Sequence, residues 1–182
     1  MAIHVQRGAT ALVHSVHDAN LKVMVDASNQ TSDTGWLDPA SAFLAGGTTL
    51  GITGTAKAAL SIPESGSAVW SIRPNTAWNR HQLVLRAVYR GTSSTTANFS
   101  VTWTANGVTL GASASVTIGA VTVGIPGITT AGLVGAVETT LNTLPLVSTM
   151  ETVGIQIARA ASDAQGAVAL LLLGAQWRVY AL

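Results

Sequence analysis

The chain has 182 residues, enough for one ordinary domain, and a formal net charge of +1. Hydrophobic residues make up 48% of it and charged residues only 9%, which excludes a disordered protein, because disorder goes with few apolar and many charged residues. The nine Lys and Arg residues are scattered, which argues against direct nucleic-acid binding, since affinity for phosphates comes from clustered cations.

The sequence contains no cysteine, which excludes disulfide scaffolds, thiol nucleophiles and cysteine-ligated zinc. Its most apolar stretch, residues 116–137, is interrupted by Pro126 and five glycines, whereas a spanning helix needs about 18 or more uninterrupted apolar residues. The N-terminus lacks the apolar run of a signal peptide. We therefore expect neither membrane insertion nor a cleaved leader.

Valine and threonine dominate the composition. They supply 19 and 23 residues and glycine supplies 18, whereas there are only two lysines and three glutamates. β-branched side chains suit the half-buried surface of a sheet, and glycines favour turns between strands. The composition predicts an all-β domain, with residues 1–60 as a less regular N-terminal segment on the core or on a neighbouring subunit and residues 61–182 as an antiparallel β-sandwich.

One short helix is predicted near the N-terminal end. Asp38 is suited to cap its start and Pro39 to occupy its first position, because proline has no amide hydrogen to donate. Gly46 and Gly47 favour its end. The pattern predicts a helix over residues 40–45.

Three segments alternate apolar and polar residues with the period of a strand: residues 67–73, 82–90 and 98–105. Trp70 and Trp103 are in phase with aliphatic neighbours, as Trp177 is later in the chain, so these three indoles are expected in the core. Asn106-Gly107 follows the third segment directly. This dipeptide favours a two-residue hairpin turn, so residues 108–118 are predicted to return beside it.

The C-terminal part of the sequence predicts three further strands. Residues 137–144 fit either a helix or a strand, and their threonines and flanking glycines favour the strand, while residues 152–159 alternate cleanly. The last strand covers residues 167–180, with a bulge expected at Gly174. Residues 170–173 of that strand are apolar on both faces, so a partner subunit or the N-terminal segment should cover the second face, with Leu171 and Leu173 as possible interface residues.

No catalytic, cofactor-binding or metal-binding residues are predicted. A metal site could in principle be formed by His14, His17 and Asp18. On an extended segment, however, the two histidine rings would lie on opposite faces, which argues against such a site. The carboxylates of Asp26, Asp33, Asp38 and Glu64 lie in turn-like contexts where capping is the ordinary role. Nucleophile-elbow, phosphate-loop and dinucleotide motifs do not occur in the sequence.

Two features of the sequence point to binding surfaces. Trp36 and Trp78 lie in predicted loops, so these two are the candidates for an aromatic platform that stacks on a sugar ring. Residues 91–137 form a run of 47 residues without any formal charge, which suits a surface buried against a partner. The alternative is that Thr, Ser and Asn in this run already supply enough polarity.

Four segments carry a resemblance to a known group of proteins: residues 68–74, 82–89, 153–159 and 172–180. Their order and spacing over the last two-thirds of the chain resemble jelly-roll structural proteins of tailed bacteriophages, above all capsid decoration (cement) proteins. The residues from Arg159 to Asp163 stand where an Arg-Asp-Gly-like loop is usual in that group, so the resemblance assigns no attachment site.

The resemblance implies a non-enzymatic jelly roll without cofactors, located on the capsid surface of a virion. It implies a homotrimer that binds the major capsid protein or another virion protein and stabilises the shell. The alternative hypothesis is a carbohydrate- or receptor-binding module of a phage tail or head fibre, with Trp36 and Trp78 as its ligand platform.

Overall fold

The computed structural model describes residues 31–52, 57–73, 81–109, 116–143 and 150–181. Within these ranges the chain forms eleven β-strands and one short 3-10 turn. The predicted all-β class is therefore confirmed. Several residues considered in the sequence lie outside the described ranges: His14, His17, Asp18, Asp26 and Trp78.

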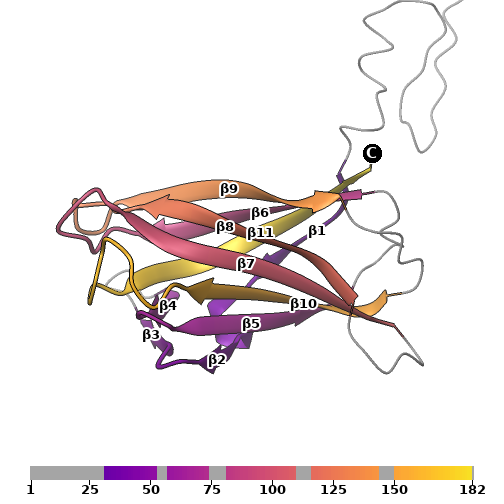
Figure 1. Cartoon of the computed structure of the whole chain (residues 1–182), viewed down its shortest axis with the longest axis horizontal. Helices are drawn as coiled ribbons and strands as arrows, with labels where there is room; N and C mark the ends of the chain where they lie inside the picture. The colour runs from indigo at the N-terminus through magenta and orange to yellow at the C-terminus, as the bar shows by residue number, and fades with distance from the viewer. Residues whose placement is uncertain (1–30, 53–56, 74–80, 110–115, 144–149, 182) are drawn as a thin grey trace, which may run out of the picture.

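The strands form two antiparallel sheets packed face to face as a sandwich, with the long strands running along the long axis of the molecule (Figure 1). The six-stranded sheet has the order β3-β4-β11-β6-β9, and β1 also pairs with β11. Its strands are β1 (Thr31–Leu37), β3 (Thr49–Ile52), β4 (Ala58–Ile62), β6 (His81–Arg90), β9 (Val134–Thr143) and β11 (Leu170–Ala181). The five-stranded sheet has the order β2-β5-β10-β7-β8. Its strands are β2 (Phe43–Ala45), β5 (Ser67–Ile72), β7 (Asn98–Thr109), β8 (Val116–Pro126) and β10 (Met150–Arg159).

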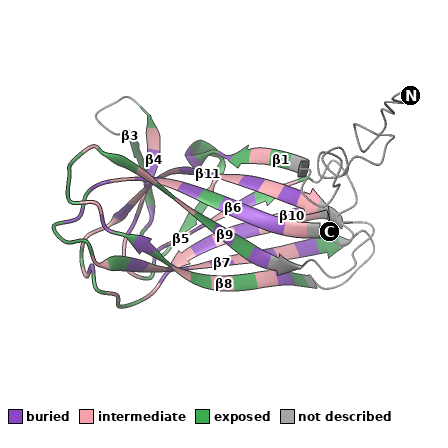
Figure 2. Ribbon diagram, turned by 90° about the horizontal axis from the view of Figure 1, so that it is seen from above, coloured by how far each residue is buried: buried purple, intermediate pink, exposed green. Residues whose placement is uncertain are grey.

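The core lies between the two sheets, and buried residues alternate with more exposed ones along the strands (Figure 2). Trp70 and Trp103 stack near its centre with ring centroids 6.5 Å apart. These two indoles and that of Trp177 are at most 5% exposed, which confirms the three tryptophans expected in the core. The strands predicted from alternation are confirmed as β5, β6, β7 and β10, and the ambiguous residues 137–144 lie almost wholly in β9.

The hairpin turn predicted at Asn106-Gly107 is wrong. Both residues lie inside β7, where Asn106 pairs with Gly154 of β10 on one side and with Thr117 of β8 on the other. A register shift between Ala105 and Asn106 accommodates the dipeptide within the ladder. Pairing on both sides of a central strand therefore overrides the local turn preference. A returning strand does lie beside β7, but it begins at Val116.

The helix predicted over residues 40–45 is also wrong in extent. Asp38 does cap a turn that starts at proline, since its Oδ1 accepts the backbone N–H of Ala40 at 2.8 Å. The turn is a 3-10 helix of three residues, Pro39–Ser41, and the chain then enters β2. Residues 43–45, which the sequence placed in the helix, instead pair with β5 as strand β2.

Part of the N-terminal segment belongs to the sandwich. From Thr31 on, the segment expected to be irregular contributes β1, β2 and β3 to the two sheets. The apolar residues 116–137 form β8, the start of β9 and the loop between them. In the part of the chain that the structure describes, no helix is long and apolar enough to cross a membrane.

The loop after β10 is fixed by a buried ion pair. Arg159 is 3% exposed, and its Nε and Nη2 each donate to a carboxylate oxygen of Asp163 at 2.8 Å. The same guanidinium donates to the carbonyls of Ile62 and Gly166, and it lies 4.9 Å above the centre of the Phe99 ring. These contacts fasten residues 160–168 across the end of the sandwich.

Candidate functional site

A gap in strand pairing along one edge of β11 creates a surface cavity. On that edge β4 pairs with Leu170, Leu171 and Leu172, and β1 pairs with β11 from Ala175 onward. In these registers Leu173 and Gly174 have no strand partner on this side. β11 is bulged at the same point, because the register with β6 shifts between Leu172 and Gly174, which confirms the expected bulge.

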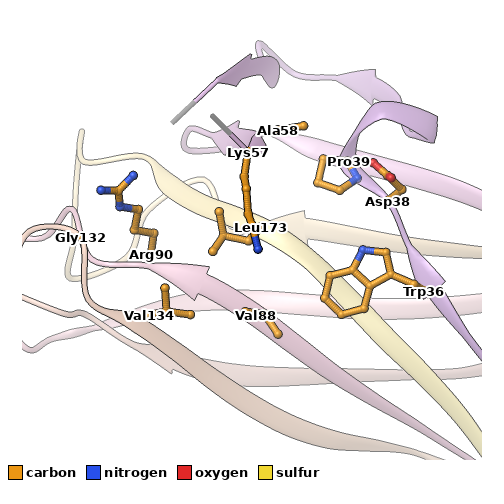
Figure 3. Close-up of a pocket in the computed structure, with 10 residues that line it drawn as sticks. All are labelled: Trp36, Asp38, Pro39, Lys57, Ala58, Val88, Arg90, Gly132, Val134 and Leu173. Carbon is orange, nitrogen blue, oxygen red and sulfur yellow. The ribbon is translucent and has the colours of Figure 1, made fainter. Parts of the chain in front are cut away.

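The cavity opens at this gap on the outer face of the six-stranded sheet and has a volume of about 580 Å³. Its lining comes from the end of β1, the 3-10 turn, the start of β4 and the residue before it, the end of β6, the β8–β9 loop, the start of β9 and the first half of β11 (Figure 3). The lining residues are Trp36, Asp38, Pro39, Lys57, Ala58, Val88, Arg90, Gly132, Val134 and Leu173.

Trp36 forms one end of the cavity and is 49% exposed. Its ring lies against the backbone of Gly174, where a Cβ atom would come within 2.5 Å of the indole Cζ2. Gly174 has a φ of +134°, a conformation that side chains other than hydrogen rarely adopt. The bulge in β11 thus supplies a flat backbone surface on which the indole rests.

Asp38 lies beside Trp36 and is held by the turn that it caps. Its carboxylate accepts the Ala40 N–H, and its backbone carbonyl accepts the indole N–H of Trp70 at 2.8 Å and the Ser41 N–H at 3.0 Å. Trp70 belongs to the core, so this wall of the cavity is tied to the packing between the sheets. The carboxylate is therefore a fixed hydrogen-bond acceptor at the Trp36 end.

Arg90 forms the opposite end of the cavity, next to Gly132 (Figure 3). Gly132 has a φ of +84°, and a Cβ there would lie 3.0 Å from Nη2 of Arg90. The Gly91 N–H donates to the Leu133 carbonyl at 2.8 Å, which fastens the loop to the end of β6. Glycine at this position leaves room for the guanidinium against the loop backbone.

The floor between the two ends is apolar. Leu173 and Val88 project from β11 and β6 between Trp36 and Arg90, with Val134 near Arg90 (Figure 3). Val134 is 52% exposed, so its side chain offers apolar surface to a ligand in the cavity. Lys57 extends across the cavity near Leu173 (Figure 3). The arrangement joins apolar contact area to a few polar groups that fix orientation, as ligand sites commonly do.

The sequence candidates fall in different places. Trp36 and Leu173 both line the cavity, whereas Leu171 lies on the same outer face of β11 and is half-buried outside it. Arg90, Lys57 and Gly132 were not singled out by sequence reasoning. Arg90 carried a weak signal, since it ends an alternating strand on its polar face, but only the tertiary fold brings it opposite Trp36.

The polar chemistry of the cavity is limited to a few groups. Among the lining residues Asp38 is the one carboxylate. Within the described ranges no group of three or more His, Asp or Glu side chains is placed to hold a metal ion.

Comparison with known proteins is informative at the level of three-dimensional structure. No family model and no curated protein sequence matches the chain. One similar structure is the C-terminal family 6 carbohydrate-binding module of a marine laminarinase from Zobellia galactanivorans, with a TM-score of 0.50 and 7% identity over 80% of this chain and 99% of that one. An exo-β-1,3-galactanase from Phanerochaete chrysosporium, solved with β-1,3-galactotriose, has a TM-score of 0.51 and 16% identity, over 82% of this chain and 30% of that one.

A family 35 carbohydrate-binding module from Clostridium thermocellum is also similar, with a TM-score of 0.49 and 14% identity over 83% of this chain and 100% of that one. At such identities a likeness establishes the fold alone. The chain is a jelly-roll β-sandwich, a fold that it shares with carbohydrate-binding modules. This confirms the jelly-roll part of the expectation drawn from the resemblance, while the virion role and the trimer stay predictions.

Proposed function

We propose that this protein is a non-catalytic carbohydrate-binding module and that the cavity on the six-stranded sheet is its glycan site. The observation that carries the proposal is the half-exposed indole of Trp36, held against Gly174 at the end of an apolar floor. Pyranose rings have an apolar C–H face and a rim of hydroxyl groups. An aromatic ring presents a large rigid surface to that face, and fixed polar groups bond to the rim.

The polar groups around the cavity suit such a ligand. Asp38 accepts hydrogen bonds, while Arg90 and Lys57 donate them, so hydroxyl groups find partners of both kinds. A volume of about 580 Å³ lies within the range of about 300–1,000 Å³ that is usual for small-molecule sites. The space therefore suits a short stretch of a glycan chain rather than a large flat partner.

Binding rather than hydrolysis is favoured by the carboxylates. Most glycoside hydrolases place two Asp or Glu side chains on either side of the bond that they cleave. Of the described residues lining the cavity, Asp38 alone is acidic, and its Oδ1 is occupied by the Ala40 N–H. The shared fold with a carbohydrate-binding module supports the same function.

Titration with a glycan array and calorimetry tests the proposal. Trp36→Ala should abolish or weaken binding at least tenfold, because loss of a stacked aromatic contact removes about 1.4 kcal/mol or more. Phe43→Ala is the matched control, since Phe43 is an aromatic residue 71% exposed on β2 that does not line the cavity. Glycan binding that is unchanged by Trp36→Ala, or no binding to any glycan, contradicts the proposal.

Capsid decoration is the second candidate function, and the outer face of the five-stranded sheet favours it. A set of outward residues along β5, β7, β8 and β10 carries no formal charge, and the cores of protein interfaces are likewise depleted of charged residues. They are Ser67, Val69, Ser71, Ser100, Thr102, Thr104, Ala120, Thr122, Gly124, Gly154, Gln156 and Ala158. Counting copies in purified phage particles separates the candidates, because a decoration protein is present in hundreds and a tail or fibre module in few.

A further inference from the structure

We infer that the glycan bound in this cavity is acidic, with its carboxylate or sulfate group held by Arg90 while a sugar ring stacks on Trp36. The inference rests on the proposed glycan-binding function and adds the chemical class of the ligand. Arg90 and Trp36 lie at opposite ends of the cavity with Leu173 between them (Figure 3). One ligand therefore contacts both only if its anionic group and its stacked ring are separated along the apolar floor.

Arg90 differs from Arg159 and Arg178 in its partners. Arg159 is paired with Asp163 inside the molecule, and Arg178 is paired with Glu138 across the six-stranded sheet. Within the described ranges Arg90 makes no ion pair and is half-buried at the cavity wall. A guanidinium beside an apolar floor, with no paired carboxylate among the described residues, is suited to an anion supplied by a ligand.

The loop backbone holds the guanidinium in a defined position. Gly132 approaches it so closely that a Cβ would lie 3.0 Å from Nη2, and the turn that contains Gly132 is fastened to Gly91. A planar guanidinium can form two parallel hydrogen bonds with a carboxylate or a sulfate, which gives geometric specificity as well as attraction. The close loop restricts the guanidinium and so lowers the conformational entropy lost on binding.

The charges around the cavity favour an anion. Arg90 and Lys57 contribute two positive charges and Asp38 one negative charge, so the described lining residues have a net charge of +1. Asp38 lies at the Trp36 end, where its carboxylate is directed to the Ala40 N–H, and Arg90 lies at the other end. The positive end is thus away from the one carboxylate that would repel an acidic sugar.

The test is a glycan array that contains uronates, sialates, sulfated glycans and their neutral counterparts, followed by calorimetry on the strongest binder. The expected result is preferential binding of acidic glycans, which weakens as NaCl is raised. Arg90→Gln should weaken this binding at least about tenfold, the loss typical of a hydrogen bond to a charged group. Arg86→Gln is the matched control, because Arg86 lies four residues earlier on β6 and is exposed outside the cavity lining.

Each outcome of the array assigns the failure to one proposal. In the first outcome, neutral glycans bind as tightly as acidic ones, Trp36→Ala removes this binding, and Arg90→Gln binds as Arg86→Gln does. This outcome overturns the inference that the ligand is acidic but leaves the proposed glycan-binding function standing. Equal losses in the two arginine variants with no effect of Trp36→Ala indicate general charge attraction and overturn the inference. No binding to any glycan overturns both proposals.

If Arg90→Gln fails to fold, Arg90→Lys is the replacement variant, because it keeps the positive charge but lacks the planar guanidinium. Binding of acidic glycans by Arg90→Lys that equals that of the wild type then overturns the inference. The uronate and sulfate arms show which anionic group is bound.

Discussion

The indole of Trp36 rests on Gly174, so closely that a Cβ added to this glycine would lie 2.5 Å from the indole Cζ2. Trp36 lies in β1, next to its last residue, and Gly174 forms the bulge of β11, 138 positions later in the chain. The bulge also reverses the alternation of β11, so that Leu172 before it and Ala175 after it both face the core. A single irregularity therefore keeps the core packed and exposes Leu173 and Trp36 at the cavity.

Gly174→Ala should disturb both stability and glycan binding. The new methyl group collides with Trp36, and the φ of +134° becomes strained, so we expect the free energy of unfolding to fall by about 1–3 kcal/mol. Gly154→Ala is the control, because a Cβ there meets nothing nearer than the Asn106 carbonyl at 3.8 Å. Urea denaturation, followed by tryptophan fluorescence, measures the free energy of unfolding of the two variants. Equal stability of the two variants contradicts the role given to the bulge.

Acid should weaken the fold through Asp163. Hydrogen bonds from Arg159 lower the pKa of the Asp163 carboxyl, and the backbone N–H groups of Ser100 and Gln165 add to this, against an opposing effect of burial. The unfolded carboxyl has a pKa of about 3.9, so its stabilisation is complete above that value and is lost as the pH falls through the lower folded pKa. Denaturation midpoints measured from pH 7 down to pH 2 should show this loss.

Asp163→Asn should remove the acid dependence that comes from Asp163 and should also lower the free energy of unfolding strongly. It leaves the buried guanidinium of Arg159 without its counter-ion, which typically destabilises a protein by about 3–5 kcal/mol. Glu138→Gln is the control, since the Glu138 side chain is 53% exposed and its pair with Arg178 lies on the surface. Surface pairs contribute about 0–1 kcal/mol. A loss in Asp163→Asn no larger than in the control contradicts a stabilising role for the buried pair.

Truncation of a core tryptophan should destabilise the protein much more than truncation of the cavity tryptophan. Trp103→Ala removes a fully buried side chain stacked on Trp70 and should lower the free energy of unfolding by about 3–5 kcal/mol. Trp36→Ala removes a side chain that is half exposed and should cost about 1 kcal/mol or less. Chemical denaturation checks both values. A Trp36→Ala variant as unstable as Trp103→Ala would place Trp36 in the structural core instead of the ligand site.

Assembly into a trimer, expected from the resemblance to virion proteins, is tested by light scattering. The expected mass is three times the 18.5 kDa of one chain, whereas a stable monomer contradicts the trimer. Two short edge strands carry large apolar side chains in solvent, with Phe43 of β2 71% exposed and Ile52 of β3 81% exposed. If these edges form the contact, Phe43→Ser combined with Ile52→Ser should lower the mass toward that of one chain. A trimer that survives this change places the contact elsewhere, for example at Leu171 and Leu173.

The sequence by itself determined the class of fold and most strand positions, because alternation with period two reports directly which side chains face the core. It also marked the capped proline turn at Asp38 and the bulge at Gly174, since caps and bulges depend on residues close together in the chain. Only the tertiary structure decided that Asn106-Gly107 continues β7, because pairing with β8 and β10 outweighs a local turn preference. The cavity likewise depends on β1 and β4 sharing one edge of β11, and it brings Trp36 opposite Arg90 through contacts between strands far apart in sequence, which no local pattern records.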